Sequence, residues 1–180
     1  GAKDPLLLGG AILLDSGRVT DSRGIVRLRN NLAHVEALRG AKAVTSGFRR
    51  MLGGDYPGHS EAELDQLALR SHWFDKGGRA RPLLDPRLLK QIKDIGFDDI
   101  LVAHWPLYDA LVCAPLILLR TQLTDQLRRE TYEEMVNRRP EAVALTIAGQ
   151  GSPALFDQQA EIEAVAAFVF EVGIVKRRVA

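Results

Sequence analysis

The longest apolar pattern in the chain runs from Phe97 to Arg139. Within it, apolar side chains recur at steps of three and four residues: Tyr108, Val112, Leu116, Leu119, Leu123 and Leu127. This period gathers side chains on one face of a helix. Prolines remove backbone donors, so we expect the helix to begin near Pro106 and to kink near Pro115. The pattern therefore predicts a long, kinked helix at the centre of the fold.

Helix-start signals predict shorter helices on both sides of this segment. Such signals are a side chain that caps the first free amides, or a proline in the first turn. They place helix starts at Asp21 or Ser22, at the capping box of Ser60 and Glu63, at Asp85-Pro86 and at Ser152-Pro153. Residues 42–58 are rich in glycine and are predicted to form a linker.

Strand signals are few. Residues 5–20 are expected to form two short extended pieces, or an apolar arm that lies on a neighbouring molecule. Residues 142–148 are the best strand candidate in the second half, and residues 168–180 fit either a helix or a strand. The expected fold class is mainly α, with a long kinked central helix, a few short strands and minor α+β character. The domains are an N-terminal arm or short strands at 1–20 and a single helical domain at 21–180.

Length and composition are those of an ordinary globular domain. The chain has 180 residues, of which 46% are hydrophobic and 26% charged. Residues 100–119 are apolar except for His104 and Asp109, and the uninterrupted run 110–119 is shorter than the roughly 20 residues that a membrane span needs. We therefore expect a buried core helix there and no membrane span.

Positive charge is concentrated near the N-terminus. Residues 1–50 carry nine Lys and Arg against four Asp and Glu, a net charge of +5, whereas the whole chain carries +1. This excess indicates either a solvated face or a surface for nucleic acid or a partner. The candidate nucleic-acid-binding side chains are Arg23, Arg27, Arg49 and Arg50.

One cysteine and the absence of a secretion signal bear on location. Cys113 lies in the apolar segment, where a lone buried thiol cannot form an internal disulfide. The first residues contain a short apolar run but no basic start followed by a cleavage pattern. We therefore expect a cytoplasmic or virion location.

The sharpest local motif is Arg29-Asn30-Asn31-Leu32-Ala33-His34, of the form R-N-x-x-x-H. It resembles the signature of the HEPN superfamily, whose members are helical, usually dimeric, and often metal-independent ribonucleases. The resemblance implies that Arg29 binds phosphate, Asn30 supports it and His34 transfers the proton of an RNA 2′-hydroxyl. The other interpretation is a surface helix whose polar side chains face water.

A second motif follows the strand candidate. Residues 149–154 have the form G-x-G-x-x-A, which can place a dinucleotide phosphate at the start of a helix, or can simply join a strand to a helix. The four histidines share no metal-ligand spacing and no G-x-S-x-G occurs, so we expect no metal, no cofactor and no nucleophile elbow.

The apolar termini and the basic first third favour a non-enzymatic structural or assembly subunit, self-associating and coat-like or shell-like. Its expected partners are further copies of itself, other assembly subunits, and nucleic acid bound through residues 1–50. The first alternative is a HEPN-like ribonuclease that uses Arg29 and His34. The second is a helical adaptor that binds one protein partner. We expect an enzyme only under the ribonuclease alternative.

Overall fold

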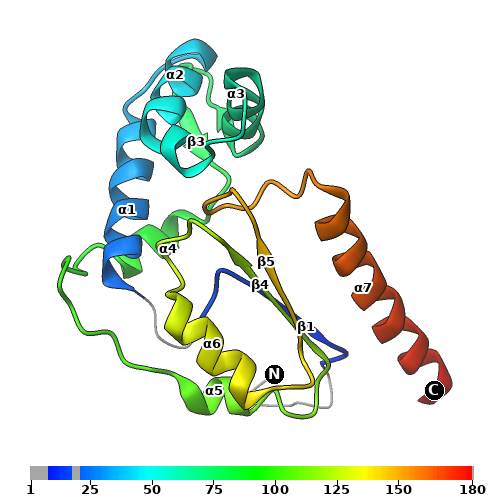
Figure 1. Ribbon diagram of the computed structural model, residues 1–180. Coiled ribbons are helices and arrows are strands. Elements are labelled where there is room, and N and C mark those ends of the chain that lie inside the picture. The colour runs from blue at the N-terminus through cyan, green and yellow to red at the C-terminus, as the bar shows by residue number, and fades with distance from the viewer. Residues whose placement is uncertain (1–7, 18–20, 180) are drawn as a thin grey trace. The chain divides into compact units, whose positions relative to one another are not determined.

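The computed structural model describes residues 8–17 and 21–179, except the side chains of Pro86 and of residues 174–179 (Figure 1). Its contacts divide the chain into two compact units. Unit 1 comprises residues 1–20 and 101–180, and unit 2 comprises residues 21–100. The predicted domain of residues 21–180 therefore contains a division near residue 100, and unit 2 interrupts unit 1 in chain order.

Unit 1 contains a three-stranded parallel sheet. Its strands are β1 (Ala11–Leu14), β4 (Leu116–Thr121) and β5 (Val143–Ile147), with β4 in the middle. Ala11 pairs with Leu116, and Ile117 pairs with Val143. Helix α6 (Arg129–Arg138) connects β4 to β5. Parallel strands joined through helices define an α/β architecture.

The central strand is buried on both faces. Leu116 and Leu118 point into a core cluster formed with side chains of α5 (Trp105–Asp109) and α6, namely Tyr108, Tyr132 and Met135, together with Leu127. Ile117 and Leu119 point the other way, toward Phe168 of α7 (Gln159–Val179). Figure 1 shows α6 and α7 on opposite sides of the strands. A parallel strand covered on both faces requires a continuous apolar run.

The close approach of β1 and α7 depends on a small residue. A Cβ at Gly10, just before β1, would lie 2.9 Å from Cγ2 of Val172 and 3.3 Å from Cζ of Phe168. Real Cβ atoms do not make the shorter of these contacts. Gly10 thus allows α7 to pack directly against the start of β1.

Unit 2 is mostly helical. Its elements are α1 (Ser22–Glu36), α2 (Ala41–Leu52), the 3-10 turn η2 (Gly53–Asp55), α3 (Glu61–Arg70), β2 (His72–Phe74), β3 (Ala80–Pro82) and α4 (Pro86–Gln91). Strands β2 and β3 pair antiparallel. Val44, Phe48, Leu64, Leu67 and Ala68 are among its buried apolar side chains.

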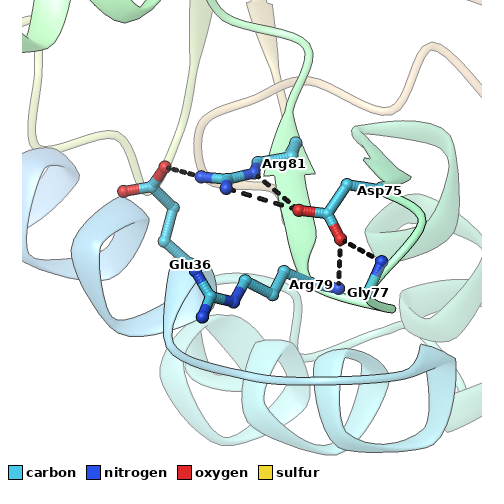
Figure 2. A network of polar contacts seen from close by, with 5 residues as sticks. All are labelled: Glu36, Asp75, Gly77, Arg79 and Arg81. Atoms are coloured by element: carbon cyan, nitrogen blue, oxygen red, sulfur yellow. Dashed lines mark hydrogen bonds and ion pairs between the residues drawn. The ribbon is translucent and has the colours of Figure 1, made fainter.

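A polar network ties the β2–β3 hairpin to α1 (Figure 2). The Asp75 carboxylate accepts hydrogen bonds from the amides of Gly77 and Arg79 at 2.9 and 3.0 Å. Arg81 lies between two carboxylates, with Nη1 3.0 Å from Glu36 and Nη2 3.3 Å from Asp75. The hydrogen bond from the Arg79 amide is the largest of the effects that lower the pKa of Asp75. The network therefore favours the ionised form of Asp75.

Several local predictions are confirmed. The side chain of Asp21 accepts from the amide of Arg23, and Ser60 and Glu63 form the predicted capping box. Asp85 caps α4, which has a proline in its first turn. The predicted strand at 142–148 is β5, and residues 168–179 belong to helix α7. These features depend on residues close together in the chain.

The mainly-α fold class is wrong, because unit 1 is built on a parallel sheet. The predicted long central helix is wrong as well: residues 97–139 contain α5, β4 and α6. The apolar run 116–119 fits a helix face and a buried strand equally well, and pairing with two neighbouring strands decides between them.

The strand interpretation of residues 5–20 agrees with β1, which pairs with β4 of the same chain, while residues 1–7 and 18–20 lie outside the described residues. Two smaller predictions need correction. The proposed linker at 42–58 contains most of α2. Cys113 is exposed. Among the helices of the described ranges, none combines the length and the apolar character that a membrane span requires.

Candidate active site

The candidate site lies in unit 1, where the three parallel strands end. Asp15 directly follows β1, Thr121 is the last residue of β4, and the loop after β5 contains Gln150 and Ser152. Because the strands are parallel, their carboxyl ends meet at one edge of the sheet. In open α/β sheets this edge is where ligands bind.

Asp15 is the central polar residue of this edge. Its side chain is buried, and its backbone has a φ of 45°, in the left-handed region that non-glycine residues rarely adopt. The carboxyl accepts hydrogen bonds from the Thr121 amide at 2.8 Å and from the Thr121 hydroxyl at 2.7 Å. The Ser152 side chain, in the loop after β5, acts to lower the pKa of the carboxyl. Through its two hydrogen bonds, Asp15 joins the ends of β1 and β4.

Burial raises the pKa of Asp15, since the charged form loses its hydration. The hydrogen bonds from Thr121 and Ser152 and the positive charge of Arg120 act in the opposite direction, but they do not cancel the effect of burial. Perturbed carboxyl groups of this kind are common at functional sites. Asp15 is therefore suited to hold or release a proton in a less acidic range than an exposed aspartate.

The loop after β5 is held in place by a buried amide. The side chain of Gln150 is fully buried, and its Nε2 donates to Asp157 at 3.0 Å and to Glu161 at 3.3 Å. Its Oε1 accepts from the amide of Leu155 at 2.9 Å. Its backbone carbonyl accepts from the amide of Leu123 at 2.9 Å. Gln150 therefore links this loop both to α7 and to the loop after β4.

The loop after β4 contains a further carboxylate of unit 1. Thr124 is buried, and its hydroxyl accepts from the amide of Gln126 at 3.1 Å. Asp125 follows in the sequence and is half-buried. The side chain of Gln122 accepts from the amide of Gly149 at 2.9 Å and so connects this loop to the loop after β5.

The dinucleotide motif is found in the predicted order of strand, loop and helix. However, α7 begins only at Gln159, so its first amides do not directly follow residues 149–154. The side chain of Gln150 in the motif donates to Glu161, and the Ser152 side chain acts to lower the pKa of Asp15. The motif therefore acts as a connection that carries site residues.

The residues of the R-N-x-x-x-H motif lie in unit 2, on α1. Nη1 of Arg29 donates to the carbonyl oxygens of Ile92, Lys93 and Ile95, at 3.0, 2.7 and 2.8 Å. Nε2 of His34 lies 3.1 Å from Nη2 of Arg50, and Asn30 is exposed. Arg29 holds the chain that follows α4, which is a structural role.

Three of the four candidate nucleic-acid-binding arginines contact carboxylates. Arg27 pairs with Asp55 at 2.9 Å, Arg49 pairs with Asp65 at 3.0 Å and also with Glu61, and Arg23 lies 3.7 Å from Asp21. Arg50 contacts His34. These pairs offset part of the local positive charge. Nucleic-acid binding by these residues stays a prediction.

Among the described residues, no group of three or more His, Cys, Asp or Glu side chains is placed to hold a metal ion.

No family model matches the chain, and no curated protein matches it. Solved structures do match. An α/β hydrolase from Novosphingobium aromaticivorans has a TM-score of 0.76 and 24% identity, with 93% of this chain and 58% of that chain covered. A putative hydrolase from Rickettsia typhi has a TM-score of 0.72 and 15% identity, with 94% and 56% covered. E-2-(Acetamidomethylene)succinate hydrolase has a TM-score of 0.64 and 19% identity, with 93% and 60% covered.

The matched residues therefore have the fold of the α/β hydrolases, and the chain spans less than two thirds of the length of these structures. This finding overturns the prediction of a non-enzymatic structural subunit, together with its capsid and virion assignment, because the similar structures are hydrolases. The comparisons do not support the ribonuclease or the adaptor alternative any better, because the similar structures are hydrolases.

Sequence reasoning missed Asp15 and Thr121 as site residues, and it included Ser152 only as part of the motif at 149–154. One signal was present: Asp15 directly follows the apolar run 11–14, as expected of a residue at the end of a buried strand. Thr121 carries no comparable signal, since its role depends on the strand pairing.

Proposed function

We propose that the protein to which this chain belongs is a hydrolase that cleaves a carboxylic ester. The observation that carries the proposal is the match to an α/β hydrolase over 93% of the chain, with a TM-score of 0.76. An esterase from M. tuberculosis, with a TM-score of 0.58 and 18% identity, supports the ester as substrate class. The chain would supply the carboxyl-end loops of β1, β4 and β5.

The polar groups at this edge suit the proposed reaction. Ester hydrolysis needs a group that accepts a proton from the attacking nucleophile and returns it to the leaving group. In α/β hydrolases the nucleophilic serine, the acid and the histidine follow one another in chain order. Asp125, after β4, has the place of the acid in this order. The loop after β5 contains Ser152 and no histidine, so this loop does not supply an imidazole base.

Carboxylates are therefore the proton-accepting groups that these loops offer. We take Asp15 and Asp125 as the two candidates, because the third carboxylate, Asp157, is bound by the buried side chain of Gln150. Asp15 has the better-defined surroundings, with both carboxyl oxygens hydrogen-bonded to Thr121. The proposal requires that at least one of the two is essential for turnover.

The test measures release of p-nitrophenolate from p-nitrophenyl acetate, butyrate and octanoate by the full-length protein. A variant with both Asp15→Asn and Asp125→Asn should lose about 100-fold or more of the rate, the usual contribution of acid–base catalysis. The matched control replaces two exposed acids, Asp94→Asn and Glu163→Gln, and should keep the wild-type rate. Absence of turnover with all three esters, or equal rates in both double variants, would refute the proposal.

Self-association, nucleic-acid binding and a cytoplasmic location are retained as proposals from the sequence alone. Sedimentation velocity of the full-length protein, with and without single-stranded RNA, tests the first two.

A further inference from the structure

One guanidinium group closes the loop that follows β4. Arg120, the second-last residue of β4, donates from Nη1 to the carbonyl oxygen of Gln122 at 3.3 Å and from Nε to the carbonyl oxygen of Leu127 at 3.0 Å. Asp125 lies between these two carbonyl groups in the chain. The side chain of Arg120 therefore spans the segment that carries one of the two candidate carboxylates.

The two ends of this loop are fixed in the core of unit 1. Thr121 is fully buried at one end, and Leu127 is fully buried at the other. Within the loop, the amide of Thr124 donates to the carbonyl oxygen of Thr121 at 3.3 Å, and the buried Thr124 hydroxyl accepts from the amide of Gln126 at 3.1 Å. A short loop with fixed ends and internal hydrogen bonds has little conformational freedom left. Asp125 is thus held on an ordered backbone.

The same loop is bound to the loop that follows β5. The amide of Gln122 donates to the carbonyl oxygen of Ile147 at 2.8 Å, and the amide of Leu123 donates to the carbonyl oxygen of Gln150 at 2.9 Å. In the opposite direction, the Gln122 side chain accepts from the amide of Gly149 at 2.9 Å. These three hydrogen bonds tie the two loops together, so a change in one loop is transmitted to the other.

We propose that Arg120 and Gln122 are positioning residues for Asp125, and that together they keep its carboxylate in one place at the carboxyl edge of the sheet. The inference rests on the proposed hydrolase function and takes Asp125 as the carboxylate that receives the proton. Asp125 is half-buried and can be reached from solvent, whereas Asp15 is buried and both its oxygens are bound by Thr121. A general base must lie within hydrogen-bond reach of the proton that it takes, so its placement affects the rate.

The step that this placement serves is a single proton transfer and its return. A water oxygen forms a bond to the ester carbonyl carbon while the Asp125 carboxylate takes one proton from that water. The bond to the leaving alkoxide then breaks, and Asp125 returns the proton to the alkoxide. A carboxylic acid and an alcohol are released, and Asp125 regains its charge.

The charge of Arg120 has a second effect, which must be separated from loop closure. Burial raises the pKa of Asp15, and the positive charge of Arg120 acts against this rise. Arg120→Lys keeps the positive charge, but an ammonium group lacks the planar fork with which a guanidinium reaches two carbonyl groups. Arg120→Gln removes both the charge and the fork. Closure of the loop therefore predicts that the two variants behave alike.

The first test measures amide hydrogen exchange of the full-length protein without a substrate. Arg120→Lys and Arg120→Gln should both speed up exchange at Leu123, Thr124 and Gln126 by about 5-fold or more, because the loop opens more often. The matched controls are Arg129→Lys and Arg129→Gln, at an arginine of α6 that is 77% exposed and pairs with Glu133. They should leave these amides unchanged. Wild-type exchange in either Arg120 variant would overturn the closure.

The second test measures turnover of p-nitrophenyl butyrate by the full-length protein. Both Arg120 variants should lower kcat by about 10-fold to 100-fold, the usual effect of a misplaced catalytic group, with KM changed by less than about 3-fold. The two Arg129 variants should keep the wild-type kcat. If Arg120→Lys restored the rate that Arg120→Gln loses, the charge would be responsible, and the positioning role would be overturned.

A double-mutant comparison identifies the carboxylate on which Arg120 acts. In an Asp125→Asn background, Arg120→Lys should cause no further loss of kcat, because the group that it positions is already inactive. In an Asp15→Asn background, Arg120→Lys should cause its full loss. The reverse pattern would assign the effect of Arg120 to Asp15 and would overturn the proposal.

Gln122→Leu reaches the same loop from an exposed position, where a failure to fold is not expected. It removes the acceptor of the Gly149 amide, so exchange at Gly149 should speed up and kcat should fall by about 3-fold or more. Faster exchange at Gly149 with a wild-type kcat would remove Gln122 from the proposal.

The exchange measurements need no substrate, so the two proposals can fail separately. Faster exchange in both Arg120 variants without any ester hydrolysis would support loop closure and refute the hydrolase function. Ester hydrolysis with unchanged exchange would support the hydrolase function and refute loop closure.

Discussion

Asp15 and Thr121 are separated by 106 positions in the chain, yet two hydrogen bonds join them, one from the Thr121 amide at 2.8 Å and one from its hydroxyl at 2.7 Å. Both bonds end on a buried carboxyl at the carboxyl edge of the sheet. A buried polar group that loses a partner costs free energy because water cannot replace it. The free energy of unfolding should therefore fall when a single donor or acceptor is removed at the ends of β1 and β4.

We expect Thr121→Val to lower the free energy of unfolding by about 1–3 kcal/mol, since the isosteric side chain removes the hydroxyl donor and leaves Asp15 one bond short. Urea denaturation measures the change. Thr121→Ser keeps a hydroxyl at the same place and should recover most of the loss. Equal destabilisation by both variants would mean that the methyl group, and not the hydrogen bond, matters there.

The raised pKa of Asp15 predicts a specific pH dependence of stability. The folded protein binds the Asp15 proton more tightly than the unfolded chain, whose aspartate has the ordinary pKa of 3.8. The stabilisation is therefore present below pH 3.8 and is lost as the pH rises through the raised folded pKa. The free energy of unfolding of wild type, relative to Asp15→Asn, should fall over that window and then stay constant. A relative stability that rises with pH would contradict the assignment.

The buried amide of Gln150 predicts that the protein loses stability when this polar group is removed. Gln150→Leu would leave the amide of Leu155 without its acceptor and would remove the donor to Asp157 and Glu161. We expect the free energy of unfolding to fall by about 1–3 kcal/mol or more. Gln158→Leu, at an exposed position of the same loop, should change it by less than about 0.5 kcal/mol. Similar effects of the two substitutions in urea denaturation would refute the anchoring role.

Arg29 is expected to matter for stability and not for RNA cleavage. Arg29→Ala removes three hydrogen bonds to the carbonyl oxygens of residues 92, 93 and 95, and should lower the free energy of unfolding by about 1.5–3 kcal/mol. Arg23→Ala is the control, because its side chain is more than half exposed. Hydrogen exchange should speed up around residues 92–95 in Arg29→Ala alone. Unchanged exchange there would argue against this role.

The network in Figure 2 predicts the opposite pH dependence in unit 2. The amide of Arg79 is the largest cause of the lowered pKa of Asp75, so the stabilisation is present above pH 3.8 and is lost as the pH falls through the folded pKa. Asp75→Asn should therefore destabilise the protein at neutral pH, and the difference from wild type should shrink below pH 3.8. Asp94→Asn, at a highly exposed aspartate, should show neither effect in thermal melts taken across this range.

Local features of the fold could be predicted because their causes lie within a few residues. Capping by Ser60 and Glu63 satisfies amides of the same helix turn, and Asp85-Pro86 starts α4 in the same way. The strand at residues 143–147 could be predicted because its residue types favour a half-buried strand. The motif at Arg29 and His34 is also local, but the contacts of Arg29 are not, because the carbonyl groups to which it donates lie more than 60 positions away.

The amino-acid sequence alone determined the caps at Asp21, Ser60 and Asp85, the helices of unit 2 that these caps begin, and the strand β5. The helix start predicted at Ser152-Pro153 is wrong, because α7 begins at Gln159. Only the tertiary structure decided that residues 116–121 form a strand, because an apolar run is compatible with a helix face until two parallel neighbours pair with it. It also decided the candidate site. Parallel strands pair through long connections, so the meeting of Asp15 and Thr121 depends on strand order and register, which no local pattern encodes.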